Sequence, residues 1–206
     1  MSKNGIYILS VSKAVGQDVK NIDSLPPKRR QKRCVPIRVT LDSQKGSYRL
    51  VGAFMELVHE QFGYALNLLK SKIFKNKYKL LYEVGAKVDL GNKIYDGPSI
   101  GLPIFLALVA KLCNFDILCK LGATGELNKY GKVLKIGLLH EKLTNAANSG
   151  ITIVIIPQEN LIEAKVLCNK YPELNKIRII CVDHVSSAAL ALYNISHYGI
   201  VDEISN

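Results

Sequence analysis

The 206-residue sequence lacks a long hydrophobic segment, and this lack argues against a membrane span. Its longest apolar stretch runs from Ile100 to Leu112 and includes Gly101 and Lys111. This stretch is shorter than the roughly 18 residues that a transmembrane helix needs. The first residues show no apolar block followed by a cleavage site, so we expect no secretory signal. We therefore expect a cytoplasmic protein without membrane contact, in which this stretch is a buried core helix.

Clusters of metal-binding side chains are also missing. The five cysteines have no C-x-x-C spacing and stand far apart, at positions 34, 113, 119, 168 and 181. Structural zinc usually needs four thiolates or imidazoles close together. We therefore expect reduced thiols, no bound metal and no cofactor.

Acidic residues are in the minority, with 17 against 28 basic residues and a net charge of +11. This excess favours contact with acidic partners but does not identify them. The densest basic run, Lys28–Arg33, follows Pro26 and Pro27 and has no apolar period, so we expect an exposed loop over about residues 24–34. The loop is either simply solvated or a docking site for an acidic partner. Aromatic residues do not interleave it as a nucleic-acid stacking platform requires, and nucleic-acid binding stays open.

Strand-like and helix-like periods alternate along the chain, which predicts an α+β (mixed α/β) fold. The length suits one domain over residues 1–206, with a frayed tail at about 197–206. The expected strands cover residues 5–11, 35–41, 80–90, 118–126, 132–136, 152–156 and 177–182. The expected helices cover residues 49–71, 99–112, 138–148, 159–169 and 185–193. We also expect a loop over residues 91–96 and a hairpin turn at residues 128–131.

A serine at the start of the expected buried helix is a candidate nucleophile. The helix opens with Asp96-Gly97-Pro98-Ser99, and Pro98 suits a first helical turn because its missing N–H would have no partner there. The free N–H groups and positive dipole end of a helix favour developing negative charge. Gly97 and Gly101 would let the backbone approach a substrate closely. Taken alone, however, the pattern favours a simple helix cap.

A lysine among apolar residues is a candidate general base. Lys142 belongs to Gly137-Leu138-Leu139-His140-Glu141-Lys142-Leu143, at the start of an expected helix. Helical spacing places it on the same face as Leu138, Leu139, Asn145 and Ala146, which we expect to face the core. Burial favours the neutral amine, and a neutral amine is what a general base must be. Taken alone, a lysine that reaches from the core to water is the simpler interpretation.

A hydroxyl between these two elements completes the pattern. Gly122-Ala123-Thr124-Gly125-Glu126 places Thr124 between small residues on an expected strand, where it could hold a lysine amine by a hydrogen bond. By itself, Thr124 is an ordinary strand residue.

Together, these elements resemble the proteolytic domain of Lon proteases. The family pattern is Asp-Gly-Pro-Ser-Ala-Gly, Thr-Gly-Glu, Gly-Gly-Leu-Lys-Glu-Lys-Leu, then Ala-Gly-Ile and Val-Ile-Ile-Pro. In order and spacing this chain matches with Asp96–Gly101, Thr124–Glu126, Gly137–Leu143, Ser149–Ile151 and Val154–Asn160. The resemblance is strongest over about residues 80–182.

The resemblance implies a single Lon-type proteolytic domain that hydrolyses peptide bonds through an acyl-enzyme. Ser99 would be the nucleophile, Lys142 the general base and later acid, and Thr124 the hydroxyl that orients the lysine. Asp96, Gly97 and Glu126 would support the site, and backbone N–H groups near Ser99 would hold the oxyanion. Such domains commonly form hexameric rings, so we expect a homo-oligomer whose number the sequence does not fix.

The chain also departs from the family pattern. Ile100 replaces an alanine and is expected to narrow the substrate channel, while Leu138 replaces the second glycine and His140 a lysine. The strand before the serine reads Gly85-Ala86-Lys87-Val88-Asp89, without the histidines of many bacterial relatives. These differences put substrate preference and loop conformation in doubt.

The sequence lacks the Gly-x-x-x-x-Gly-Lys-Ser/Thr loop of an ATPase, and the residues before Ser99 leave no room for such a module. We therefore expect a peptidase that is independent of ATP on this chain or is fed by a separate ATPase or adaptor partner.

Two alternatives remain. The run Gly97–Gly101 also fits the Gly-x-Ser-x-Gly elbow of an α/β-hydrolase esterase, with Asp183 and either His184 or His197 completing a triad. A catalytically silent Lon-like scaffold, or a nucleic-acid-associated assembly protein, is the second alternative. Retention of Ser99, Thr124 and Lys142 together argues against a silent scaffold.

Overall fold

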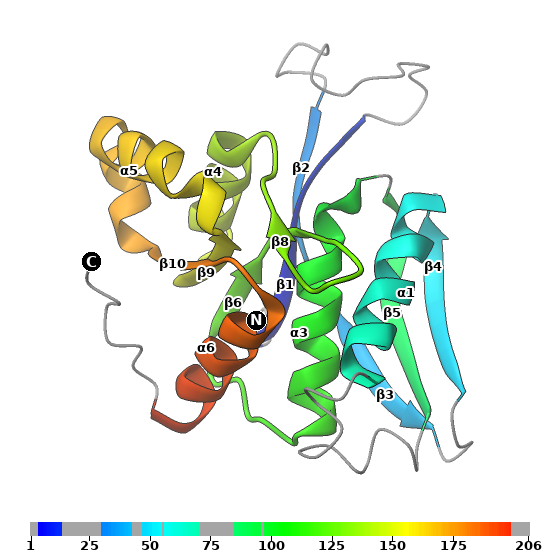
Figure 1. Ribbon diagram of the computed structural model, residues 1–206. Coiled ribbons are helices and arrows are strands. Elements are labelled where there is room, and N and C mark those ends of the chain that lie inside the picture. The colour runs from blue at the N-terminus through cyan, green and yellow to red at the C-terminus, as the bar shows by residue number, and fades with distance from the viewer. Residues whose placement is uncertain are drawn as a thin grey trace.

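The computed structural model describes residues 4–13, 30–42, 47–54, 56–70, 85–95 and 97–198. Over these residues the chain forms five α-helices and three small sheets, which is the mixed α/β fold that the alternating pattern predicted. Figure 1 shows helix α3 at the centre, with strands on either side of it. Among the described residues, none of the helices has the length and apolar character needed to cross a bilayer.

The largest sheet has five strands in the order β10-β9-β6-β1-β2. Their bounds are Gly5–Lys13 (β1), Arg30–Pro36 (β2), Lys120–Ala123 (β6), Ile153–Pro157 (β9) and Arg178–Val182 (β10). Strands β1, β6, β9 and β10 are parallel, and β2 is an antiparallel edge strand. The pairing of β1 with β6 ends at Ile8 and Ala123, and beyond that point β1 pairs with β2 alone as far as Lys13.

The second sheet has the order β3-β5-β4, with strands Arg38–Asp42 (β3), Tyr48–Phe54 (β4) and Gly85–Tyr95 (β5). Strand β4 corrects the expectation that a helix begins at residue 49. Tyr48 and Leu50 are half-buried while Arg49 and Val51 are exposed, so this segment follows the two-residue period of a strand. The helix α1 begins only at Glu56 and ends at Lys70.

Two further expectations about these strands are wrong. The strand expected over residues 35–41 divides at Ile37, and its halves belong to different sheets. The loop expected from residue 91 is strand as far as Tyr95, because β5 pairs with Ala53 and Phe54 beyond a register shift at which the extra residues belong to β5. The basic run is likewise not all loop: Arg30–Arg33 lies in β2, whereas Lys28 and Arg29 fall outside the described residues.

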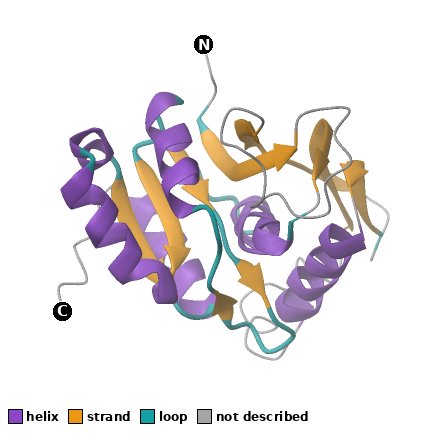
Figure 2. Ribbon diagram, turned by 90° about the horizontal axis from the view of Figure 1, so that it is seen from above, coloured by secondary structure: helices purple, strands orange, loops and turns teal. Residues whose placement is uncertain are grey.

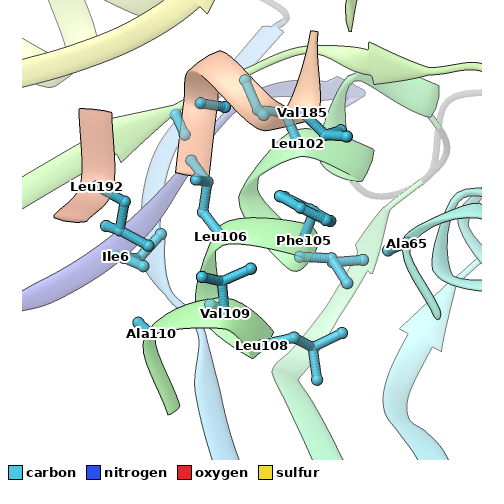
Figure 3. Packing of buried hydrophobic residues seen from close by; sticks show 14 of the residues in the cluster. Ile6, Ala65, Leu102, Phe105, Leu106, Leu108, Val109, Ala110, Val185 and Leu192 are labelled. Carbon is cyan, nitrogen blue, oxygen red and sulfur yellow. The ribbon is translucent and has the colours of Figure 1, made fainter. Parts of the chain in front are cut away.

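Helix α3 (Gly101–Leu112) is the centre of the core, and all its residues except Lys111 are buried. Figure 2 shows it between the five-stranded and three-stranded sheets, and Figure 3 shows Leu102, Phe105 and Leu106 packed with residues of neighbouring elements. Burying a large apolar side chain stabilises a fold by about 1.5–3 kcal/mol. Burial of this apolar run therefore fixes the position of the helix that follows Ser99.

The remaining elements surround this centre as the sequence pattern predicted. They are β7 (Glu126–Leu127), β8 (Val133–Leu134), α4 (Leu139–Asn148), α5 (Leu161–Lys170) and α6 (Val185–Tyr198), with short 3-10 turns at Pro98–Ile100 (η4), Gln158–Asn160 (η5) and Pro172–Lys176 (η6). Strands β7 and β8 form the expected hairpin, but Thr124 and Gly125 separate β7 from β6. Helix α6 extends through His197 to Tyr198, and the rest of the expected frayed tail lies outside the described residues.

Candidate active site

Ser99 lies in the 3-10 turn η4, immediately before the buried helix α3. Gly97 precedes the turn in an extended conformation, and a Cβ added to it would meet only Ser99 Oγ, at 3.9 Å. The side chain of Ile100, by contrast, is 2% exposed and belongs to the core. This position explains how a large residue fits beside the serine: it fills the interior, so the expectation that it narrows a substrate channel is wrong.

Thr124 follows the last residue of β6 at the carboxyl end of the parallel strands. Its backbone N–H donates to Ile155 O at 3.1 Å, which continues the pairing of β6 with β9. The next residue, Gly125, donates its N–H to Ser99 O at 2.8 Å and accepts from Leu102 N at 2.9 Å. These bonds join the threonine segment directly to the serine turn.

Lys142 lies in the first turn of α4, and its side chain is directed to the same place. Its backbone N–H donates to Leu138 O at 3.1 Å, and Leu139, Leu143 and Ala146 share its buried face. Lys142 Nζ lies 3.2 Å from Ser99 Oγ and 3.2 Å from Thr124 Oγ1. Lys142 is only 5% exposed and Thr124 is fully buried. The structure thus brings the lysine of the sequence pattern within hydrogen-bond reach of both the serine and the threonine.

The turn that leads into α4 is held by a residue to which the sequence pattern assigned no role. Asn160, fully buried at the end of η5, accepts from Ile136 N and donates to Ile136 O, each at 3.0 Å. Its amide also donates to Glu163 at 3.0 Å. Leu138, which stands where the family has glycine, adopts a left-handed backbone with φ +58°. Because Asn160 holds Ile136, the turn keeps its left-handed conformation at residue 138 with leucine in place of glycine.

Gln61 is the second residue whose role the sequence pattern did not reveal. It is 1% exposed, and its amide bonds both backbone groups of Leu127 in β7. A Cβ on Gly101 would collide with this amide. Gly101 therefore admits Gln61, and the expectation that it lets a substrate approach is wrong. A polar residue at an otherwise apolar helical position was the available signal.

Two acidic residues were expected to support the site. Glu126 lies directly after Gly125, and burial, together with the nearby Glu60 carboxylate, raises the pKa of its side chain above the ordinary value. Tyr64 donates its hydroxyl to Glu60 at 2.6 Å on the same side of α1. Asp96 lies outside the described residues.

The histidines of the alternative triad have other partners. His184 contacts Tyr130 O at 3.0 Å and Ser186 Oγ at 2.8 Å. His197 stacks on Tyr193 with ring centroids 4.1 Å apart and contacts Ser196 Oγ at 2.7 Å. The triad interpretation has no support in this geometry, because among the described residues the basic group that bonds Ser99 Oγ is Lys142.

A family model described as the Lon protease (S16) C-terminal proteolytic domain matches residues 32–193. The chain belongs to this Lon family. Curated Lon proteases from Clostridium beijerinckii and Neorickettsia sennetsu are each 32% identical to it, over 73% and 75% of this chain. A Lon protease from Buchnera aphidicola is 34% identical over 60% of the chain.

The match to Lon proteases is confined to one part of those proteins. The aligned segment is 19% of the Clostridium and Neorickettsia proteins and 16% of the Buchnera protein. The family-model match over residues 32–193 contains the serine turn, the threonine segment and the lysine helix described above. The resemblance stated from the motifs is therefore confirmed for the Lon proteolytic domain.

Proposed function

We propose that this Lon-type domain is a serine endopeptidase in which Ser99 and Lys142 form a catalytic dyad. The observation that carries the proposal is the distance of 3.2 Å between Lys142 Nζ and Ser99 Oγ, in a place where the lysine is almost fully buried. A serine hydroxyl becomes a good nucleophile when an adjacent base accepts its proton. Burial favours the neutral amine that this task requires.

The first half of the reaction is acylation. The neutral Lys142 amine accepts the Ser99 proton while Oγ attacks the carbonyl carbon of the scissile peptide bond. Backbone N–H groups of the turn η4 would stabilise the developing oxyanion. The first two N–H groups of α3 are already bonded, that of Gly101 to Pro98 O and that of Leu102 to Gly125 O. The Lys142 ammonium then gives its proton to the leaving nitrogen, so the amine product departs and Ser99 carries the acyl group as an ester.

The second half returns the enzyme to its starting state. Lys142, neutral again, accepts a proton from a water molecule that attacks the ester carbon. The proton then passes to Ser99 Oγ as the C–O bond breaks, and the acid product leaves. Thr124 Oγ1, 3.2 Å from the amine, holds Nζ in place through both halves. The residues need no metal or cofactor for these steps.

The experiment that tests this proposal is cleavage of unfolded casein by the wild type, Ser99→Ala and Lys142→Ala, each with and without ATP. We expect cleavage by the wild type alone, and loss of at least about 1,000-fold in either variant, because both halves of the dyad are needed for proton transfer. A serine-directed fluorophosphonate should label the wild type and not Ser99→Ala. Absence of cleavage and labelling in every assembly state would favour a silent scaffold instead.

We also propose that substrates reach the site without ATP bound to these residues, because the sequence has no phosphate-binding loop. Either the domain acts alone on unfolded or docked proteins, or a separate ATPase or adaptor delivers substrates to it. In both cases we propose a homo-oligomer, which by family resemblance is a hexameric ring. If ATP markedly accelerated the cleavage of folded substrates by the purified chain alone, the proposal that the domain acts without ATP would be contradicted. Size-exclusion chromatography with light scattering measures the assembly.

The basic residues of the edge strand β2 support a docking role for acidic segments. The edge strand β2 carries Arg30, Lys32 and Arg33, and it pairs with the part of β1 that continues beyond β6, where Thr124 follows. Replacing these three by glutamine should raise KM for an acidic protein substrate and leave KM for a neutral peptide unchanged. An equal change for both substrates would contradict the docking role.

A further inference from the structure

Gln61 is a buried polar residue on a helix face that is otherwise apolar. Its neighbours on the buried face of α1 are Val58, Phe62, Ala65, Leu68 and Leu69. A buried amide is costly unless it is hydrogen-bonded. Gln61 meets this requirement with one partner: Nε2 donates to Leu127 O at 3.1 Å, and Oε1 accepts from Leu127 N at 2.7 Å.

Through these two hydrogen bonds, the Gln61 side chain pairs with the backbone of β7 as a neighbouring strand would. On its other side β7 lies along β8, with Glu126 opposite Leu134 and Leu127 opposite Val133. Strand β7 has only two residues, so pairing with β8 alone gives it few bonds. The amide from α1 therefore fixes its position across 66 residues of sequence.

The strand that Gln61 holds is continuous with the segment that bonds the nucleophile turn. Two residues before Leu127, Gly125 bonds Ser99 O at 2.8 Å and Leu102 N at 2.9 Å. One residue earlier, Thr124 lies 3.2 Å from Lys142 Nζ.

The Gln61 amide also packs against the end of the serine turn. Gly101, two residues after Ser99, lies so close to the Gln61 amide that any Cβ at this position would collide with it. The amide of Gln61 thus lies between the start of α3 and β7, whose neighbouring residues carry Ser99 and Thr124.

We propose that Gln61 is a positioning residue for the serine–lysine dyad. By holding Leu127 on one side and packing on Gly101 on the other, it fixes the Ser99 turn relative to Thr124 and Lys142. The inference rests on the proposed peptidase function, because it concerns the distance between the nucleophile and its base. Gln61 touches none of the reacting atoms itself.

The test compares Gln61→Met with Leu69→Ala in the full chain. Methionine keeps the length of the side chain but removes both bonds to Leu127. Leu69, 1% exposed, lies two turns further along the same helix, so its truncation weakens the packing of α1 and leaves the contacts of Gln61 intact. Casein-peptide hydrolysis and fluorophosphonate labelling are measured well below each variant's Tm and corrected for the folded fraction.

We expect kcat and the labelling rate of Gln61→Met to fall about 10- to 100-fold with KM unchanged, since a misplacement of about 1 Å can cost roughly 100-fold. Leu69→Ala should stay within about threefold of the wild type. If the two variants lose activity equally, the positioning role is wrong while the dyad stands. If the wild type itself is neither active nor labelled, the proposed function fails first.

Gln61→Glu decides the question where Gln61→Met does not fold. An ionised carboxylate still accepts from Leu127 N but repels Leu127 O, whereas a protonated one restores both bonds. The nearby carboxylates of Glu60 and Glu126 favour protonation at this position. We expect the activity of Gln61→Glu relative to the wild type to rise at least fivefold between pH 8 and pH 5.5. A ratio that is constant over this range would overturn the inference.

Discussion

Thr124→Val removes one hydroxyl from the site and changes almost nothing else. Valine has nearly the same shape as threonine, and Thr124 is fully buried, so its replacement leaves no hole. The change deletes the contact of 3.2 Å between Oγ1 and Lys142 Nζ. It therefore isolates what the threonine does for the lysine.

The magnitude follows from the change in charge of the amine during the reaction. In the proposed mechanism, Lys142 begins neutral and becomes an ammonium as Ser99 attacks. A hydrogen bond is worth about 0.5–1.5 kcal/mol between neutral groups and about 1.5–3 kcal/mol when one group is charged. Only the difference, about 1–1.5 kcal/mol, lowers the barrier, because catalysis depends on interactions that strengthen in the transition state. We expect kcat to fall roughly 5- to 12-fold with KM unchanged.

The assay is steady-state hydrolysis of an unfolded-protein peptide, together with the rate of fluorophosphonate labelling. Thr124→Ser is the matched control, since it keeps the hydroxyl and loses only a methyl group, and it should stay near the wild-type rate. A loss below twofold in Thr124→Val would refute the reasoning. So would a loss as large as that of Ser99→Ala, because an orienting hydroxyl cannot equal the nucleophile.

Two predictions concern stability. Gly150→Ala should lower the free energy of unfolding by about 1–2 kcal/mol, because Gly150 has φ +68°. Gly137→Ala is the control and should change this free energy little, because a Cβ at Gly137 meets open space. Urea unfolding of both variants separates backbone strain from a general effect of the added methyl group. Glu126→Gln should raise the urea midpoint at pH 7, because a raised folded-state pKa means that the ionised carboxylate disfavours the fold. The gain should shrink as the pH falls toward the ordinary pKa of 4.5, and an undiminished gain at pH 4 would contradict this origin.

Local patterns predicted those parts of the fold and site that depend on neighbours in sequence. The apolar run after Ser99 became the central helix, and the leucines and alanine at helical spacing from Lys142 placed it on a buried face. The segment at residues 49–54 was misassigned because a short strand that leads into a helix satisfies both periods over a few residues.

The positioning amides could not be predicted, because their partners are distant in sequence. Gln61 binds a residue 66 positions away, and Asn160 one 24 positions away. A polar side chain at a buried position signals that it needs a partner, but the sequence alone does not say which backbone will supply it.

In the described part of the chain, the buried polar side chains are concentrated at the candidate active site. They are Gln61, Thr124, Lys142 and Asn160, and each of them lies in the site or fixes a segment that enters it. In the proposed mechanism, a lysine kept at 5% exposure serves reactivity at the expense of stability. Lys142→Met should therefore be at least as stable as the wild type while unable to cleave. Such a variant would hold protein substrates without destroying them, and could be used to capture and identify them.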